Sequence, residues 1–347
     1  MSFAHKIKVG VLRGGPSPEY EVSLKTGANI LANLGEEYEP ADILISKDGV
    51  WHERGVERKP ENVLPRLDLV INGLHGKYGE DGEVQRLLEH FKVPYTGSTS
   101  LASAIAMNKV AAKKIYRHHG LKTPASFVIP FEDLSKQMIR SAYESVPAPF
   151  IVKPSSAGSS VGVHLARSLP ELEEAVIAAA EHSPAVLIEE MIEGKEATCG
   201  VIDHFRNTEH YPLIPIEIRH GRDLFDYAAK YSDSKNGGAE EICPGNFTPE
   251  ESDLIKQLAT EAHRALHLRH YSRSDFIVHP RRGIYILETN TLPGLTETSL
   301  LPKSLQAIGS NIKEFLSHLI NKALGKNVDH SGFEPLTSSL QMRRSTN

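Results

Sequence analysis

Short apolar runs alternate with helical patterns at the start of this chain, and glycine-containing loops separate them. Residues 7–12 (IKVGVL) and 67–72 (LDLVIN) are two such runs, and a helical pattern between them stops at Gly35. Strands that alternate with helices predict a parallel α/β unit. Ligands bind at the carboxyl ends of such strands, so the loops GGPSPE and LHGKYGEDG that follow the two runs form the candidate functional edge.

Two further units are expected, because 347 residues exceed what one hydrophobic core usually supports. The second contains the strand FIVK, the loop PSSAGSSVGV and a helix opened by a capping box from Ser168 to Glu171. The third contains a helix that Thr248 caps, followed by the strand pair SRSDFIV and GIYILETN. The predicted division is 1–107 for the N-terminal α/β domain, 108–196 for a central α+β domain, 197–325 for a C-terminal α+β domain, and 326–347 for a frayed tail.

Composition argues against several classes of function. The net charge is −5 and no basic stripe is present, so we expect no nucleic-acid partner. No apolar run reaches the roughly 20 residues that a membrane-spanning helix needs. Two cysteines cannot form a disulfide framework, and no signal-peptide pattern opens the sequence, so a cytoplasmic protein is expected.

Three oxygen-bearing side chains predict a cation site in the third unit. Asp275 lies in one strand pattern, and Glu288 and Asn290 lie two residues apart in the next. The period of a strand places the last two on one face. Carboxylates and an amide carbonyl suit Mg²⁺, which also binds substrate phosphates. The alternative is a strand whose outer face is simply solvated, but Ile284, Ile286 and Leu287 predict a largely buried strand, where unpaired acids are costly.

Phosphate-binding groups are also suggested. The loop PSSAGSSVGV follows Lys153 and offers backbone N–H groups, hydroxyls and an ammonium to a polyphosphate, although it is also compatible with a flexible surface hairpin. Lys109 and Lys230 are further candidates, and each is equally compatible with an ordinary solvated lysine. By contrast, His263, His267 and His270 have helical spacing that could suggest zinc, but we interpret them as a polar helix surface.

Taken in order, the motifs of this chain resemble those of the D-alanine:D-alanine ligase family. They are GGPSPEYEVS, LHGKYGEDG, VPYTGS, MNK, VKPSSAGSSVGV, VLIEEMIEGKE, FDYAAKY, SRSDF and LETNTLPGLTETSLLP, and the likeness covers about residues 7–322. The resemblance implies a three-domain ATP-grasp fold with ATP held between the central and C-terminal domains. It also implies a homodimer and ADP-forming synthesis of D-alanyl-D-alanine, a peptidoglycan precursor, through an acyl phosphate.

The resemblance also implies roles for individual residues on the ATP side. Lys109, Lys153 and Lys230 would contact the phosphates, with Lys230 on a loop that closes over the site. Asp275, Glu288 and Asn290 would bind two Mg²⁺ ions, for which Mn²⁺ can substitute. The adenosine moiety would be bound by Glu189, Met191 and Ile192 around adenine and by Glu196 at the ribose hydroxyls.

On the amino-acid side, the resemblance implies that Glu19 holds the first ammonium group and that hydrogen bonds link Glu19, Ser159 and Tyr231. Arg273 and the backbone N–H of Gly294 would stabilise the oxyanion. The second substrate would be bound by Ser299 and Leu300, and His75 would flank the amino-acid site. Ser274 departs from the pattern, because an apolar residue is more usual between the arginine and the aspartate.

Two alternative functions stay open at this level. A relative of the same class joins D-alanine to D-serine or D-lactate, and Tyr231 argues against D-lactate because lactate-preferring relatives commonly replace this tyrosine. A non-catalytic nucleotide-binding relative would have lost a metal ligand or the oxyanion arginine, whereas Asp275, Glu288, Asn290 and Arg273 are all present.

Overall fold

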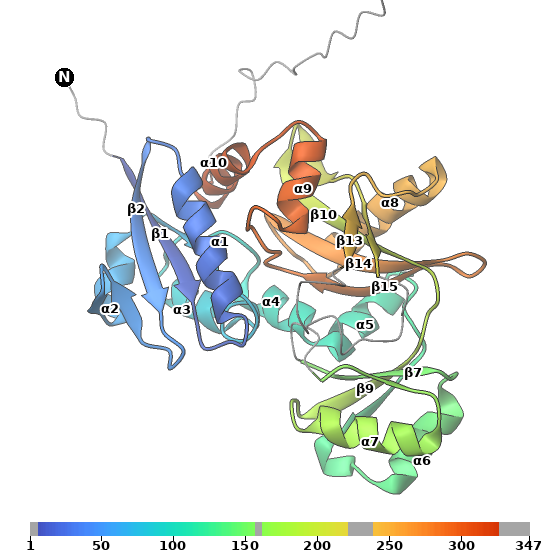
Figure 1. The fold of residues 1–347 in the computed structure, drawn as a ribbon. Helices are drawn as coiled ribbons and strands as arrows, with labels where there is room; N and C mark the ends of the chain where they lie inside the picture. The colour runs from blue at the N-terminus through green and yellow to red at the C-terminus, as the bar shows by residue number, and fades with distance from the viewer. Residues whose placement is uncertain (1–5, 157–161, 221–238, 326–347) are drawn as a thin grey trace, which may run out of the picture.

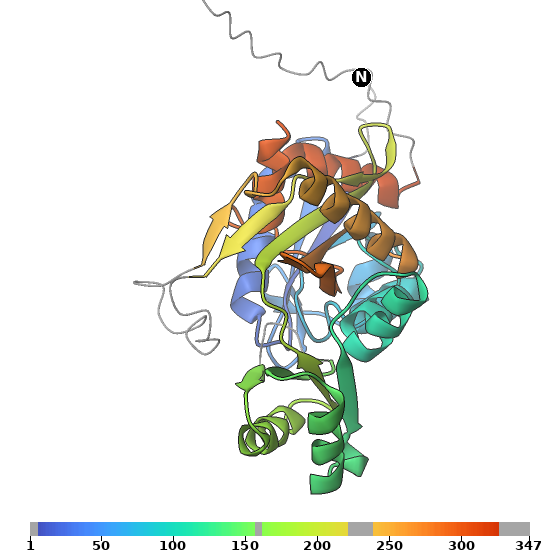
Figure 2. The same cartoon turned by 90° about the vertical axis from the view of Figure 1, so that its right-hand side faces the viewer.

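The chain folds around three β-sheets, which the computed structural model describes for residues 6–156, 162–220 and 239–325 (Figure 1). One sheet lies in the N-terminal part, one in the middle of the chain and one in the C-terminal part. The middle part extends away from the other two in both views (Figure 2). This α/β architecture confirms the predicted fold class. The division into domains near residues 107 and 196 stays a prediction.

The N-terminal sheet carries the two loops that were predicted to face ligands. Its elements are β1 (Ile7–Gly14), α1 (Tyr20–Asn33), β2 (Tyr38–Ile45), β3 (Trp51–Glu53), β4 (Val56–Glu57), α2 (Pro60–Val63), the 3₁₀ helix η1 (Leu64–Arg66), β5 (Leu69–Asn72) and α3 (Glu83–His90). The strand order is β4-β3-β2-β1-β5, and β1 is parallel to β2 and to β5. The loops after β1 and β5 therefore leave the same edge of the sheet.

Two consecutive helices connect this sheet to the rest of the chain. They are α4 (Ser100–Met107) and α5 (Lys109–His118). Asn108 separates them, and its side chain accepts hydrogen bonds from the backbone N–H groups of Val110 and Ala111, both at 3.1 Å. This cap satisfies donors that the first turn of α5 leaves free. Because α5 begins directly after this cap, Lys109 is the first residue of the helix.

The middle of the chain forms an antiparallel sheet covered by helices. Its elements are β6 (Ser126–Pro130), the 3₁₀ helix η2 (Phe131–Asp133), α6 (Lys136–Ser145), β7 (Phe150–Pro154), β8 (His164–Ala166), α7 (Leu169–Ala180) and β9 (Ala185–Glu190), with strand order β6-β9-β7-β8. Ser168 caps α7 as predicted. The capping box is incomplete, because the Glu171 carboxylate accepts from the N–H of Arg167 instead of that of Ser168.

The C-terminal sheet is the largest of the three. Its elements are β10 (Lys195–Phe205), β11 (Thr208–Pro212), β12 (Ile216–Arg219), β13 (Glu240–Ile242), α8 (Pro249–Ala265), β14 (Tyr271–His279), β15 (Gly283–Asn290), α9 (Leu300–Ala307) and α10 (Ile312–Ala323). The strand order is β13-β12-β10-β14-β15, and β11 pairs with β10. At the start of α8, Thr248 and Glu251 form both hydrogen bonds of a capping box, which confirms that prediction.

Two hydrophobic cores join segments that are far apart in the sequence. One packs α10 through Phe315 and Leu319 beside Val9 and Ile71 of the N-terminal sheet. The other packs α4 and α5 beside α8 and the C-terminal sheet. The first of these cores holds the N-terminal and C-terminal sheets against each other, so residues on their facing edges can form one site.

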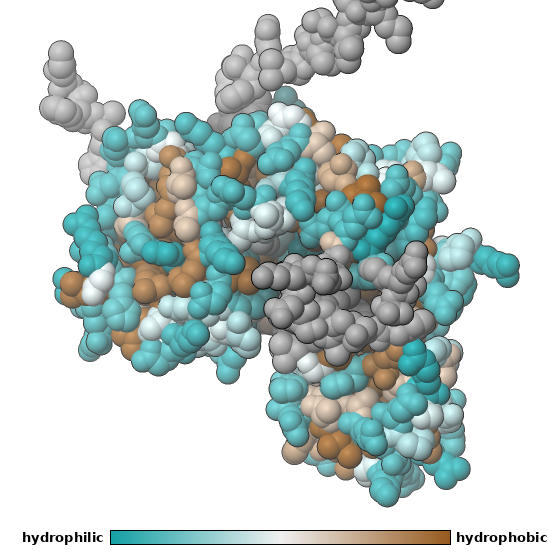
Figure 3. Space-filling view, viewed as in Figure 1, coloured by the Kyte–Doolittle hydropathy of each residue, from teal (hydrophilic) through white to brown (hydrophobic). Residues whose placement is uncertain are grey.

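The surface of the molecule is mainly hydrophilic on the face shown in Figure 3, where hydrophobic residues form separate patches. None of the helices in the described parts of the chain combines the length and apolar character needed to span a bilayer.

Candidate active site

The paired strands β14 and β15 bring four of the predicted residues together. Their register places Arg273 opposite Asn290 and Asp275 opposite Glu288. A register shift after Asp275 places Phe276 opposite Ile286, so Leu287 is an extra residue on β15. Residues that face each other across strands have their side chains about 5 Å apart when they share a face. The strands therefore gather a guanidinium, two carboxylates and an amide.

Asp275 lies at the centre of this group and receives hydrogen bonds from three neighbours. The Arg273 guanidinium donates to both of its oxygens, at 3.0 and 2.9 Å. The Thr198 hydroxyl on β10 donates to Oδ1 at 2.6 Å, and the Asn290 side chain lies 3.2 Å from Oδ2. Although burial acts to lower it, Asp275 holds the pKa of the Arg273 guanidinium above its ordinary value. The orientation of the Asp275 carboxylate is thus set from three strands.

Glu288 is held in its charged form by lysines. Its Oε2 lies 3.0 Å from the Lys109 Nζ at the start of α5. The Lys109 charge is the main cause that lowers the pKa of Glu288 to about 2, and the Lys153 and Arg273 charges act in the same direction against burial. A carboxylate that stays ionised at any physiological pH is available to bind a cation.

Lys153 is positioned by a buried carboxylate in the middle sheet. Lys153 on β7 and Lys113 on α5 both form ion pairs with Glu189 on β9. Burial acts to raise the pKa of Glu189, but Lys153 and Lys113 hold it below its ordinary value. Burial lowers the pKa of Lys113 to about 8. Glu189, which was predicted beside adenine, is therefore engaged with two ammonium groups.

The donor set around Asp275 fits a hard divalent cation. Asp275, Glu288 and Asn290 offer carboxylate and amide oxygens within one small group, and the amide of Asn290 can present its oxygen by rotation. Arg273 and Lys109 now neutralise these carboxylates. With the Glu189 pairs included, four cationic side chains meet three carboxylates, so one net positive charge remains for an anionic ligand such as a polyphosphate.

The loops after β1 and β5 meet at the shared edge of the N-terminal sheet, as predicted. Gly76 comes so close to Glu19 that a Cβ on it would lie 2.5 Å from Glu19 Oε2 and 2.6 Å from Ser17 Oγ. Gly76 also has a φ of +66°, which favours glycine. His75 is buried, with Nε2 2.8 Å from the Thr26 hydroxyl and Nδ1 3.4 Å from Glu80 Oε1. Glu19 and His75 thus share one corner of the sheet.

The segment after β15 brings Gly294, Ser299 and Leu300 together. Ser299 precedes the first residue of α9, Leu300, and its hydroxyl lies close to Gly294, where a Cβ would be 2.8 Å away. The Asn29 side chain on α1 donates to the Leu295 carbonyl at 2.6 Å. This hydrogen bond ties the Gly294 segment to the N-terminal sheet. Gly294, Ser299 and Leu300 therefore form one group.

The remaining predicted residues fall into two sets. Glu196 at the start of β10 lies 2.6 Å from His220 Nε2, and Met191 and Ile192 follow directly after β9, where the Met191 N–H donates to the Pro149 carbonyl at 2.8 Å. Glu196, Met191 and Ile192 are thus close in sequence around the strand-to-strand connection. Ser159, Lys230 and Tyr231 lie outside the described residues, as does the proposed tail 326–347.

One interpretation of the histidines was wrong. His263, His267 and His270 do not share a helix surface, because α8 ends at Ala265. His263 is fully buried and His270 is nearly so. The spacing was read as helical beyond the true end of the helix. A left-handed backbone at His267, with φ of +51°, directly follows the helix cap and turns the chain out of the helical path.

Sequence reasoning also missed residues that hold the site in place. Thr198 bonds to Asp275 from 77 residues away, and Lys113 reaches Glu189 across 76 residues. Lys113 had one usable signal, since it lies four residues after Lys109 on the same helix face. Ser274 is buried, and its hydroxyl lies 2.8 Å from the Thr289 hydroxyl, to which Tyr116 also donates at 2.8 Å. The polar residue at this position thus has polar partners.

Comparison with protein-family models covers most of the chain. Residues 115–321 match the family model described as D-ala D-ala ligase C-terminus, and residues 8–66 and 52–98 match the one described as D-ala D-ala ligase N-terminus. A D-alanine--D-alanine ligase of Pelotomaculum thermopropionicum is 36% identical over 323 residues, which are 92% of this chain and 97% of the relative. One of Bacillus anthracis is 36% identical over 321 residues, or 92% and 97% of the two chains.

Solved structures give the same pattern. The VanG D-Ala:D-Ser ligase from Enterococcus faecalis superposes with a TM-score of 0.81 at 28% identity, covering 92% of this chain and 100% of the other. A D-alanine--D-alanine ligase from Bacillus anthracis complexed with ATP superposes with a TM-score of 0.76 at 31% identity, covering 92% and 98%.

Proposed function

The chain belongs to the D-ala D-ala ligase family of ATP-grasp enzymes, and we propose that it joins two D-alanines to D-alanyl-D-alanine with ATP and Mg²⁺, in the cytoplasm and as a homodimer. ATP-dependent ligation is the activity of this family. The choice of D-alanine for both substrates, the metal and the roles of individual residues are the proposal. One observation carries it: the Arg273, Asp275, Glu288 and Asn290 group on β14 and β15, with Lys109 beside it.

The first chemical step transfers the terminal phosphoryl group of ATP to one D-alanine carboxylate. This step needs charge neutralisation and positioning more than proton transfer. Lys109, Lys153 and Lys230 supply ammonium groups to the phosphates. Asp275, Glu288 and Asn290 would hold Mg²⁺, which would neutralise negative charge on the phosphate groups during the transfer. Glu189 forms an ion pair with the Lys153 ammonium, and it thereby positions this lysine for the phosphates.

The second step forms the peptide bond. The amine of the second D-alanine attacks the acyl phosphate, and phosphate leaves from the tetrahedral intermediate. Arg273 and the N–H of Gly294 stabilise its oxyanion. The bidentate contact of Arg273 with Asp275 supports this role, because it fixes the plane of the guanidinium before substrate binds.

The amino-acid side chains of the pocket orient the two substrates. Glu19 holds the ammonium group of the first D-alanine, His75 flanks it, and Ser299 with Leu300 takes the carboxylate of the second. The meeting of Glu19 with the Gly76 loop, and the position of Ser299 at the start of α9, support these assignments. Helix N-termini favour carboxylates because their N–H groups are unpaired. Adenine would lie by Met191 and Ile192, the ribose by Glu196, and Ser159 and Tyr231 would link to Glu19.

A D-alanine:D-serine ligase is the second candidate, because the VanG D-Ala:D-Ser ligase superposes as well as the other solved relatives. The sequence relatives favour D-alanine, because those at 36% identity over 92% of the chain are named D-alanine--D-alanine ligase. A catalytically inactive relative is disfavoured, because each proposed metal ligand and the oxyanion arginine is present.

The deciding experiment measures phosphate release with ATP, Mg²⁺ and D-alanine, alone and with D-serine or D-lactate as a competing second substrate. Mass analysis identifies each product. We expect D-alanyl-D-alanine as the main product in the mixture with D-serine. A dominant D-alanyl-D-serine product would make D-serine the second substrate. If none of these acids supported ATP-dependent phosphate release, the proposal would be contradicted.

A further inference from the structure

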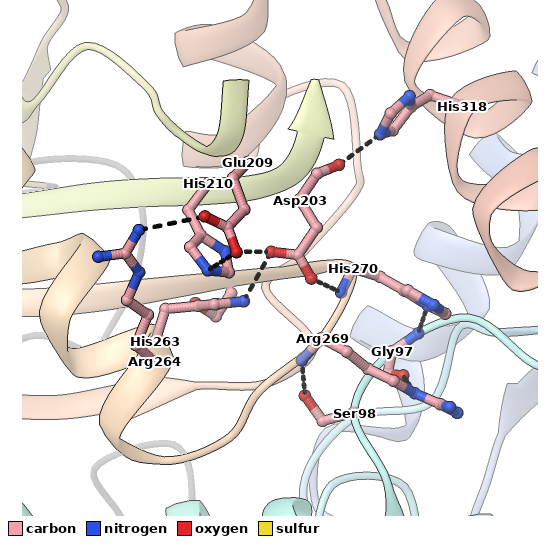
Figure 4. A network of polar contacts seen from close by, with 11 residues as sticks. Gly97, Ser98, Asp203, Glu209, His210, His263, Arg264, Arg269, His270 and His318 are labelled. Carbon is pink, nitrogen blue, oxygen red and sulfur yellow. Dashed lines mark hydrogen bonds and ion pairs between the residues drawn. The ribbon is translucent and has the colours of Figure 1, made fainter. Parts of the chain in front are cut away.

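A second group of side chains that could bind a metal joins the C-terminal sheet to α8, outside the group around Asp275. It consists of Asp203 on β10, His210 on β11 and His263 on α8, and Figure 4 shows their side chains pointing toward one another. One ligand atom from each of the three residues lies within 4.8 Å of the others. We propose that Asp203, His210 and His263 bind one Zn²⁺ ion or a similar late first-row divalent cation.

The hairpin of β10 and β11 fixes the positions of Asp203 and His210 relative to each other. Asp203 and His210 are directly opposite in the antiparallel register. The two residues between the strands, Arg206 and Asn207, both have positive φ, of +48° and +61°. Such two-residue turns match the twist of the strands that they join and fix their register. The pair is therefore positioned by backbone geometry and not only by its own hydrogen bond.

Both imidazoles face the same carboxylate oxygen. Asp203 Oδ1 lies 2.7 Å from His210 Nδ1 and 3.0 Å from His263 Nε2. His263 has no exposed surface, and its Nε2 forms no hydrogen bond among the described residues even though Oδ1 is close. The contact between Nε2 and Oδ1 is thus an ion pair without the angle of a hydrogen bond. A cation between the three atoms would give Nε2 a direct bond in place of this poorly aligned contact.

Neighbouring groups hold the other atoms of the cluster. His263 Nδ1 lies 2.7 Å from the Ser272 hydroxyl, and Asp203 Oδ2 accepts from the His270 N–H at 2.6 Å. Metal-binding histidines usually have their second ring nitrogen engaged in this way, which sets the ring orientation. With Oδ2 and Nδ1 occupied, Oδ1 and Nε2 remain as the atoms that face the cluster centre.

The chemistry of the group selects the cation. Two imidazoles and one carboxylate suit Zn²⁺, with distances of about 2.0–2.2 Å and an approximately tetrahedral arrangement completed by water. Atoms around such an ion are about 3.3 Å apart, so Asp203 Oδ1 needs to move about 0.6 Å away from His210 Nδ1, which lies 2.7 Å from it, and about 0.3 Å away from His263 Nε2, which lies 3.0 Å from it. Mg²⁺ prefers oxygen ligands and is a poor match. The ion would join α8 to the β10–β11 hairpin.

The test uses the full-length protein, stripped of metal and then equilibrated with Co²⁺ in a large excess of Mg²⁺, which occupies oxygen-ligand sites. Tetrahedral Co²⁺ absorbs visible light much more strongly than octahedral Co²⁺. We expect about one Co²⁺ per chain with the strong tetrahedral band and no thiolate band in the near ultraviolet. We also expect Zn²⁺ to displace this band and to raise Tm.

Variants assign the signal to residues. His210→Gln should abolish the band and the Zn²⁺-dependent rise in Tm, and this partly exposed edge position tolerates substitution better than His263. Asp203→Asn should weaken binding at least tenfold. His118→Ala, at an exposed histidine on α5, should keep the Co²⁺ band and the Zn²⁺-dependent rise in Tm. Glu288→Gln should keep the same two signals even though its turnover is lost. Absence of a tetrahedral band in the wild type, or its persistence in His210→Gln, would overturn the proposal.

Discussion

The Lys109 ammonium and the Glu288 carboxylate lie 3.0 Å apart and join the start of α5 to β15. The pair links two parts of the chain that are 179 residues apart in numbering, from 288 − 109. Each partner is proposed to bind a different part of the nucleotide complex, with Lys109 at phosphate and Glu288 at the cation. The contact therefore holds both groups near the position where a metal-bound polyphosphate would lie.

Replacing Glu288 with glutamine should reduce turnover by on the order of 100-fold or more, because a directly bound ligand counts for more than the outer-shell partners whose loss costs about 10–100-fold. Phosphate release with saturating ATP and D-alanine measures the effect. Circular dichroism should stay unchanged. Glu144→Gln, which removes an exposed carboxylate that pairs with Arg140 on the same helix, is the matched control. Wild-type turnover of Glu288→Gln in Mg²⁺ would refute the metal assignment.

Replacing Arg273 with lysine should lower kcat by roughly 10²–10³-fold, the usual cost of losing one oxyanion donor. A flexible point charge cannot reproduce the two parallel hydrogen bonds to Asp275. ATP binding, followed by calorimetry, should persist. If kcat and ATP affinity both matched the wild type, Arg273 would have no part in stabilising the oxyanion.

Replacing Thr198 with valine should lower kcat about fivefold, which corresponds to about 1 kcal/mol for one hydrogen bond. The substitution keeps the side-chain volume but removes the donor to Asp275 Oδ1. The KM for D-alanine should change little, because Thr198 acts through Asp275. Thr260→Val, which removes a hydroxyl bonded to its own helix, is the control. Equal losses in both variants would indicate a general effect of removing hydroxyls.

Replacing Glu89 with glutamine should lower the free energy of unfolding by about 0.5–1 kcal/mol at pH 7. The expected loss is small because the Glu89 side chain is exposed to solvent, which screens its charge. Although burial acts to raise it, hydrogen bonds from Ser100 and Tyr95 hold the pKa of the Glu89 carboxyl below its ordinary value of 4.5. A carboxyl whose pKa is lower in the folded chain than in the unfolded chain stabilises the fold at pH values above the unfolded pKa. This stabilisation is lost as the pH falls below about 4.5 and the Glu89 carboxyl takes up a proton.

Thermal unfolding of both proteins across this range tests the Glu89 prediction. The difference in Tm between wild type and variant should be largest near pH 7 and should shrink as the carboxyl becomes protonated. A difference that stays constant down to the lowest pH at which the wild type is folded would show that the charge of Glu89 is not responsible.

Local sequence patterns were enough to predict the parts of this protein that depend on neighbouring residues. The period of a strand placed Glu288 and Asn290 on one face, and the capping residue Thr248 placed the start of α8. The glycine loops after β1 and β5 were predicted to meet because parallel strands end at one edge. The order of motifs identified the family, which the comparisons confirm.

Only the tertiary structure decided which distant groups pair. Thr198 bonds to Asp275 because β10 is hydrogen-bonded to β14, and no pattern near either residue specifies that pairing. His263 was taken for a surface residue, but it is buried against Asp203 because α8 packs across β10. Helix capping and helical periodicity act over a few residues, whereas strand pairing and burial depend on the whole chain. For this reason the sequence determined the candidate side chains, and the packing of the sheets determined their partners.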